Sequence, residues 1–69
     1  MTTNEEKMIE TLEEARKSSE HSRFPVYAYS NGERITFVAE YNRNALEPYL
    51  TKEGYWICSI FENGHRVEA

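Results

Sequence analysis

Cys58, His21 and His65 are the residues of this sequence best suited to act as a nucleophile, a general base or a zinc ligand. A zinc site needs about three or four such ligands, and the chain has neither a Cys-x-x-Cys pair nor two histidines one helical turn apart. A nucleophilic Cys–His pair also needs a third group that orients the histidine, and the sequence pattern supplies none. We therefore predict no catalytic residue and no metal site.

The glycines and the charged residues argue against cofactor chemistry. Gly32, Gly54 and Gly64 all fall in expected turns, so the chain has no glycine-rich loop that could hold a phosphate group. Twelve acidic residues against eight Lys and Arg give a net charge of −4, opposite to the basic surface of a typical nucleic-acid-binding protein. We expect a protein that is not an enzyme and that has no cofactor.

The length of the chain allows one small domain, residues 1–69, with a thin margin of stability. No apolar run approaches a membrane span, the N-terminus is too polar for a signal peptide, and a lone cysteine suits a reducing compartment. We therefore expect a cytoplasmic protein.

Apolar residues at helical spacing predict an amphipathic helix from about Asn4 to about Ser19; these residues are Met8, Ile9, Leu12 and Ala15.

Two Asn-Gly dipeptides predict two β-hairpins, because a two-residue type I′ turn needs residues that accept positive φ angles. The first joins Phe24–Ser30 to Arg34–Tyr41 and places Ser30 opposite Glu33. The second joins Tyr55–Phe61 to His65–Val67 and places Phe61 opposite Arg66.

Between the hairpins, Asn44 is a suitable helix N-cap, and Pro48 limits the expected helix to about one turn. The predicted fold class is α+β. An N-terminal amphipathic helix packs on a four-stranded antiparallel sheet made of the two Asn-Gly hairpins, with a short helical turn between them.

Alternation of side chains assigns one face of this sheet to the core and leaves the other face open. The expected core face is mainly aliphatic and consists of Val26, Ala28, Ile35, Phe37, Ala39, Trp56, Cys58, Ile60 and Val67. The open face is aromatic and polar, and its predicted partner-binding residues are Tyr27, Tyr29, Arg34, Thr36, Tyr55, Phe61 and Arg66. Three roles stay open for it: packing for stability alone, binding of a different protein, and a homodimer through the sheet face.

Two sets of short motifs resemble known families. The segments Ser18-Ser19-Glu20-His21-Ser22, Pro25-Val26-Tyr27-Ala28, Ala45-Leu46-Glu47 and Gly54-Tyr55 resemble, over about a third of the chain, the small RNA-polymerase inhibitors of T7-like phages. That family lacks the Asn31-Gly32 hairpin and a long N-terminal helix.

The expected helix followed by Phe24-Pro25-Val26 and Asn31-Gly32 resembles Sm- and Hfq-like RNA-binding subunits. The Tyr-Lys-His segment with which bacterial members bind RNA is missing from this chain, and Tyr55–Ala69 does not fit the family. No functional residue is transferred from either resemblance.

We expect a small non-enzymatic module that binds a protein partner and inhibits or regulates it, of the kind that phages and mobile elements encode. The alternative is a small nucleic-acid-binding regulator, Sm- or Hfq-like or of another kind, that stacks bases on the aromatic sheet face. The acidic balance argues against this alternative, because phosphate binding depends on clustered cations.

Overall fold

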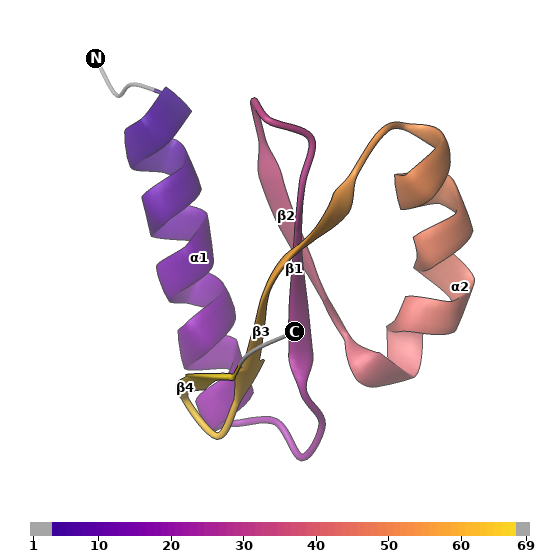
Figure 1. Cartoon of the computed structure of the whole chain (residues 1–69). Helices are drawn as coiled ribbons and strands as arrows, with labels where there is room; N and C mark the ends of the chain where they lie inside the picture. Colours follow the sequence, from indigo (N-terminus) through magenta and orange to yellow (C-terminus); the bar gives the residue numbers. More distant parts are fainter. Residues whose placement is uncertain (1–3, 68–69) are drawn as a thin grey trace.

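A computed structural model of the chain describes residues 4–67. Its elements, in order, are helix α1 (Asn4–Glu20), strands β1 (Val26–Ser30) and β2 (Ile35–Ala39), helix α2 (Glu40–Lys52), and strands β3 (Trp56–Glu62) and β4 (His65–Val67) (Figure 1). All strand pairs are antiparallel, and the sheet order is β2-β1-β3-β4. The predicted α+β fold is confirmed. Within residues 4–67, no helix has the length and apolar character needed to cross a membrane.

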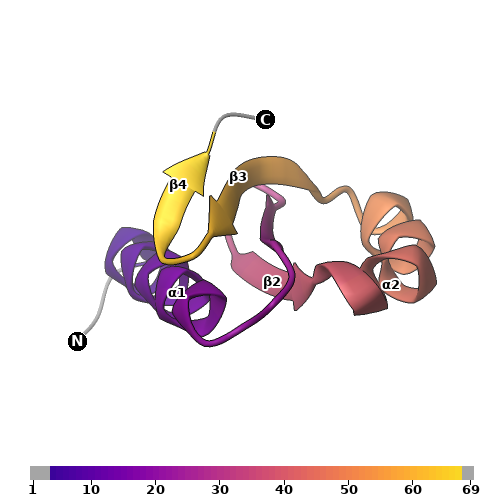
Figure 2. The ribbon, with the colours of Figure 1, turned by 90° about the horizontal axis from the view of Figure 1, so that it is seen from below.

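The two helices lie on opposite sides of the sheet (Figures 1 and 2). Helix α1 contacts all four strands, whereas α2 has its main contacts with β1 and β2. The chain runs from β2 through α2 to β3, and β1 lies between these two strands, so the three elements form a split β-α-β unit. The second face of the sheet was expected to lie open. This expectation is wrong for the part of the face that β1 and β2 form, because α2 packs there.

Helix α2 is much longer than the predicted single turn. It has 13 residues, begins directly after β2 with Ala39 as its N-cap, and continues through Pro48. Proline cannot donate a hydrogen bond to the carbonyl four residues earlier, which is that of Asn44. Both residues are exposed, so water can solvate this carbonyl and the helix can continue.

The C-terminal end of α2 is closed by a Schellman motif. The N–H of Tyr55 donates to the carbonyl of Leu50 (2.9 Å), and the N–H of Gly54 donates to the carbonyl of Thr51 (3.1 Å). Gly54 has a φ of 86°, which explains why a glycine stands at this position. The motif sets the point at which the chain enters β3.

The hydrophobic core lies between α1 and the sheet. Its buried members are Ala15, Val26, Ala28 and Phe61, and the half-buried residues that pack against them are Leu12, Ile35, Phe37 and Cys58. The predicted core positions on β1 and at the start of β2 are therefore confirmed. Ile9 is 66% exposed, so its predicted place in the apolar stripe of α1 is wrong.

The β3–β4 hairpin has the predicted turn. Asn63 and Gly64 have φ angles of 51° and 80°, as a type I′ turn requires. The register places Phe61 opposite Arg66, as expected.

The β1–β2 hairpin has a longer loop than predicted. Ser30 pairs with Ile35 rather than with Glu33, so the loop contains two additional residues. The carboxamide oxygen of Asn31 accepts hydrogen bonds from the N–H groups of Glu33 (2.9 Å) and Arg34 (2.8 Å). The side-chain oxygen thereby takes the place of the backbone carbonyl that accepts such a bond in a tight turn. A shift of two residues leaves the faces of both strands unchanged.

Strand β3 contains a β-bulge. Tyr29 pairs with Ile57, whereas the preceding residue Ala28 pairs with Ser59. Cys58 is therefore an additional residue that has no counterpart on β1. It packs with the core under α1.

The bulge reverses the predicted faces in the second half of β3. Phe61 pairs with Val26 and belongs to the core under α1, although the sequence pattern placed it on the open face. Ile60 pairs with Tyr27 and lies on the opposite face, although it was predicted for the core. Strict alternation gave the wrong face because it does not include the additional residue.

The β3–β4 turn is held against the C-terminal end of α1. The N–H of Gly64 donates to Ser19 Oγ (2.9 Å), and Ser19 Oγ donates to the Arg16 carbonyl (2.6 Å). Arg16 Nη1 donates to the Gly64 carbonyl (3.3 Å), and the same guanidinium forms ion pairs with Glu13 and Glu20, both at 2.6 Å. These contacts fix the position of the short strand β4.

Candidate functional site

The residues predicted to bind a partner do not form one surface. Tyr29 and Phe61 are buried, with only 2% and 6% of their surface exposed. Tyr27 and Thr36 are half-buried on the sheet face that α2 approaches, and Tyr55 is half-buried just before β3. The predicted open aromatic face is corrected accordingly, since α2 covers Tyr29 and the bulge moves Phe61 into the core.

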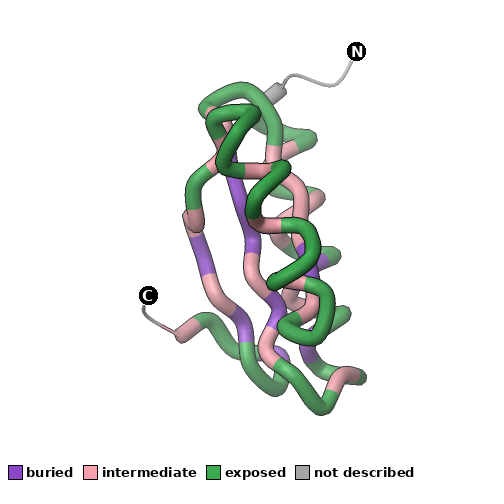
Figure 3. The backbone as a smooth tube through the Cα atoms, turned by 90° about the vertical axis from the view of Figure 1, so that its right-hand side faces the viewer, coloured by how far each residue is buried: buried purple, intermediate pink, exposed green. Residues whose placement is uncertain are grey.

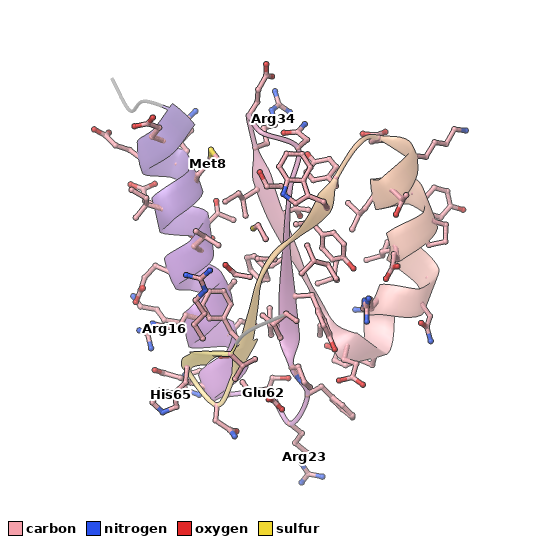
Figure 4. The ribbon with its side chains drawn as sticks, in the orientation of Figure 1. Met8, Arg16, Arg23, Arg34, Glu62 and His65 are labelled. Atoms are coloured by element: carbon pink, nitrogen blue, oxygen red, sulfur yellow. The ribbon has the colours of Figure 1, made fainter. Side chains whose placement is uncertain are left out.

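The two arginines of the predicted site are exposed but far apart. Arg34 lies in the β1–β2 loop, and Arg66 lies in β4 next to His65. Figure 4 shows Arg34 and His65 at opposite ends of the molecule. One binding patch cannot include both arginines together with the tyrosines between them.

Arg34 lines a cleft between the start of β2 and helix α1. The cleft has a volume of about 280 Å³, and its charged residues are Lys7, Glu33 and Arg34. Small-molecule sites usually have volumes of roughly 300–1,000 Å³ and an apolar lining. This cleft is a weak candidate for a ligand site because it is small and its charges are mixed.

Tyr29 is the centre of a polar network that joins α2 to the sheet. Arg43 Nε donates to the Tyr29 hydroxyl oxygen (3.1 Å), and the hydroxyl donates to Glu47 Oε2 (3.2 Å). Arg43 and Glu47 also form an ion pair at 2.7 Å. The Arg43 guanidinium lies over the ring of Tyr27, 4.5 Å from its centroid. Two of the predicted partner-binding tyrosines therefore bind a helix of the same chain.

The ionisation of this network follows from its surroundings. Burial raises the pKa of the Tyr29 hydroxyl, which is therefore neutral at physiological pH and can donate its proton to Glu47. The hydrogen bond to Tyr29 raises the pKa of Arg43, so the guanidinium stays charged. These ionisation states suit a structural contact.

Because Arg43 and Glu47 face the sheet, helix α2 exposes apolar side chains to solvent. Tyr41, Ala45 and Tyr49 are spaced four residues apart, so they share one side of the helix, away from Arg43 and Glu47. Tyr41 and Tyr49 are 67% and 71% exposed. No residue of α2, which the structure describes over its whole length, is fully buried, as the view onto this helix shows (Figure 3).

Two further residues extend this apolar surface. Phe24, from the loop between α1 and β1, makes an edge-to-face contact with Tyr41, with ring centroids 5.6 Å apart. Leu46 lies beside the line of Tyr41 and Tyr49, and both Leu46 and Phe24 are exposed. The α2 outer face consists of Phe24, Tyr41, Ala45, Leu46 and Tyr49.

The sequence contains a signal for this surface, namely the four-residue spacing of Tyr41, Ala45 and Tyr49. The sequence prediction does not include this surface, because Pro48 predicts a helix of only about one turn. A full helix over residues 40–52 would have grouped these three residues on one side and Arg43 with Glu47 on the other.

Groups for nucleophilic or metal chemistry are dispersed. His21 and His65 are exposed and Cys58 is half-buried, and burial raises the pKa of the Cys58 thiol, which lowers its reactivity at neutral pH. Within residues 4–67, no three side chains of His, Cys, Asp or Glu are placed so that they could hold a metal ion.

Comparison of the chain with protein-family models, with curated proteins and with solved structures finds no match. The geometry of the molecule itself is therefore the basis for assigning a function.

Proposed function

We propose that this protein is a small, non-enzymatic protein-interaction module and that its binding surface is the α2 outer face. One observation carries the proposal: helix α2 directs Arg43 and Glu47 towards the sheet and exposes Tyr41, Leu46 and Tyr49 to solvent. Amphipathic helices of globular domains normally have the opposite orientation. Clustered exposed apolar residues on a folded domain mark sites of interaction.

The composition of the α2 outer face suits a protein partner. Tyrosine is enriched among residues that dominate binding energy, because its ring offers a large apolar contact and its hydroxyl remains hydrated. Charged residues flank the surface, with Glu40 at the start of α2 and Lys52 and Glu53 at its end. An apolar centre with a polar rim is the usual arrangement of a protein–protein interface.

A module of this kind acts by occupying a surface of its partner, and in this way it inhibits or regulates that partner. A cytoplasmic setting agrees with the single half-buried cysteine, which needs no oxidising compartment.

The proposal is tested by photo-crosslinking in the cells that produce the protein. A crosslinking amino acid is placed at position 49, in the α2 outer face, and in a second variant at position 9. Ile9 is the matched control because it is apolar, is 66% exposed and lies on the other helix. We expect a specific protein adduct from position 49 that is absent from position 9 and is lost when Leu46→Ser is added. An equal set of adducts from both positions, unchanged by Leu46→Ser, would show that α2 is not the binding surface.

A further inference from the structure

We infer that the outer edge of β2, the side of this strand that faces away from β1, binds the C-terminal segment of another protein as an additional antiparallel strand. Strand β2 is the last strand of the sheet order β2-β1-β3-β4, so only one of its sides is paired. A strand in this position offers a row of N–H and C=O groups to an extended peptide. This role goes beyond the proposed function, because it uses residues outside the α2 outer face.

A hydrogen bond at the end of the hairpin shows which backbone groups of β2 point outwards. The N–H of Glu40 donates to the carbonyl of Pro25 (3.0 Å). Residues bonded in this way alternate along an antiparallel ladder, so Ile35, Phe37 and Ala39 direct their backbone groups away from β1. In the part of the chain that the structure describes, nothing pairs with the outward N–H and C=O groups of Ile35 and Phe37.

Strand β2 lacks the features that normally prevent an edge strand from pairing. Natural sheets protect their edges with short strands, charged side chains, prolines or bulges. The opposite edge, β4, has only three residues, of which His65 and Arg66 are exposed. Strand β2 has five uncharged residues without a proline or a bulge, and all except Val38 are only half-buried. The molecule thus protects one edge and leaves the other able to accept a strand.

The charges at the start of β2 suit a carboxylate. The cleft between α1 and β2 is lined by Lys7 and Arg34, with Glu33 as the acidic residue among its lining residues, so its net charge is positive. Figure 4 shows Arg34 and Met8, which also lines this cleft, at the same end of the molecule. An added antiparallel strand runs opposite to β2, so its C-terminal end arrives at Ile35 and therefore at this cleft.

The placement of the two cations favours a C-terminal carboxylate over an acidic side chain. Ile35 packs with the core under α1, so the side chain of the preceding residue, Arg34, starts from the opposite face of the sheet. Lys7 belongs to α1 itself. A group between the two cations lies in line with the added backbone, whereas side chains of a strand point above or below the sheet. The cleft is small for a complete ligand (about 280 Å³), but one carboxylate needs only part of this space.

A library of random peptides of about seven residues, displayed with free C-termini, supplies the probe. Synthetic copies of the enriched peptides are titrated against the full chain by fluorescence anisotropy, as the free acid and as the C-terminal amide. We expect apolar sequences, which pack beside Ile35 and Phe37, with a Kd of about 1–100 µM. The amide should bind at least about fivefold more weakly, because it lacks the charge that Lys7 and Arg34 attract.

Variants of the chain test the edge and the cleft separately. Ala39→Pro should weaken binding at least about fivefold, because the proline ring replaces an outward N–H, and the φ of −76° at this position suits proline. Lys7→Gln and Arg34→Gln should each weaken binding of the free acid about two- to fivefold and leave the amide unchanged. Lys17→Gln, at an exposed position of α1 outside the cleft, is the matched control. Circular dichroism melts show whether each variant folds.

Methylation of single amide nitrogens in the peptide tests the strand geometry. Only every second amide of an antiparallel strand pairs with a given neighbour, so a methyl group there should weaken binding at least about fivefold. A methyl group on the intervening amides should change the Kd less than about twofold, because these N–H groups point to solvent.

Four results overturn the inference. Enrichment of no peptide, or equal binding of the acid and the amide, excludes a C-terminal segment as the occupant. Equal sensitivity of all amides to methylation excludes an added strand. Binding that Ala39→Pro leaves unchanged and Leu46→Ser weakens places the peptide on the α2 outer face, which supports the proposed function alone. A dimer in sedimentation equilibrium that Ala39→Pro dissociates makes a second copy of the chain the occupant of this edge.

Discussion

The Tyr29 hydroxyl group stands at the centre of the polar contact between α2 and the sheet, and Tyr29→Phe removes that group while keeping the ring. The hydroxyl accepts one hydrogen bond from Arg43 and donates one to Glu47. Hydrogen bonds to charged groups contribute about 1.5–3 kcal/mol each when no solvent replaces them. The side chains of Arg43 and Glu47 are 32% and 41% exposed, so water replaces part of the loss. We expect the free energy of unfolding to fall by about 1–2 kcal/mol.

Urea unfolding followed by circular dichroism measures this loss, and a thermal melt should show a fall of about 5–15 °C for a domain of this size. Tyr27→Phe is the matched control, because Arg43 contacts Tyr27 through its ring, which phenylalanine retains. We expect this control to change the free energy of unfolding by less than about 0.5 kcal/mol.

The reasoning is refuted if Tyr29→Phe and Tyr27→Phe have the same stability. A double-mutant cycle between Tyr29→Phe and Glu47→Gln separates the pairwise contact from other effects of each change. Additive losses in that cycle would show that the 3.2 Å contact between the two side chains does not stabilise the fold.

Phe61→Ala should cost about 3–5 kcal/mol and leave the domain largely unfolded in a thermal melt, because Phe61 is part of the core and not of an open face. Gly64→Ala should lower the melting temperature more than Gly32→Ala, because both glycines have positive φ but only at Gly64 does an added Cβ collide with the Glu20 side chain. The raised pKa of the Tyr29 hydroxyl means that the folded state holds the hydroxyl proton more tightly than the unfolded state. The contribution of the neutral hydroxyl to the free energy of unfolding is therefore present below about pH 10 and is lost as the pH rises further. The unfolding free energy of the wild type should therefore approach that of Tyr29→Phe in alkaline solution, and a constant difference would contradict the assignment. Fluorescence anisotropy with single-stranded RNA and DNA should show no binding tighter than about 10⁻⁴ M at physiological salt, and micromolar binding that weakens with salt would favour a nucleic-acid-binding function.

The sequence was sufficient to predict the elements whose signals are local. Periodicity and turn residues located α1, all four strands and the Asn63-Gly64 turn, and alternation placed Val26 and Ala28 in the core. These features depend on contacts between neighbours in the chain, and so a single sequence contains them.

The missed features depend on tertiary contacts that outweigh a local preference. Pro48 disfavours a helix interior, yet α2 continues through it, since the Tyr29 hydroxyl and Arg43 tie the helix to the sheet. The bulge at Cys58 has no marker in the sequence, and one unmarked residue is enough to exchange the faces of Phe61 and Ile60. The candidate site was missed for the same reason, since the α2 outer face exists only if the helix is long.

The crossover from β2 through α2 to β3 sets the order in which the chain can complete its sheet as it folds. Strand β1 occupies a central position, and the edge that faces β3 stays unpaired until residues 56–61 have joined the sheet. The β1–β2 hairpin and α2 form from contiguous segments, so they can assemble before β3 is in place. A chain folded only this far therefore presents Val26 and Ala28 on a strand with one bare edge, and such an edge pairs readily with a chaperone or with another partly folded chain.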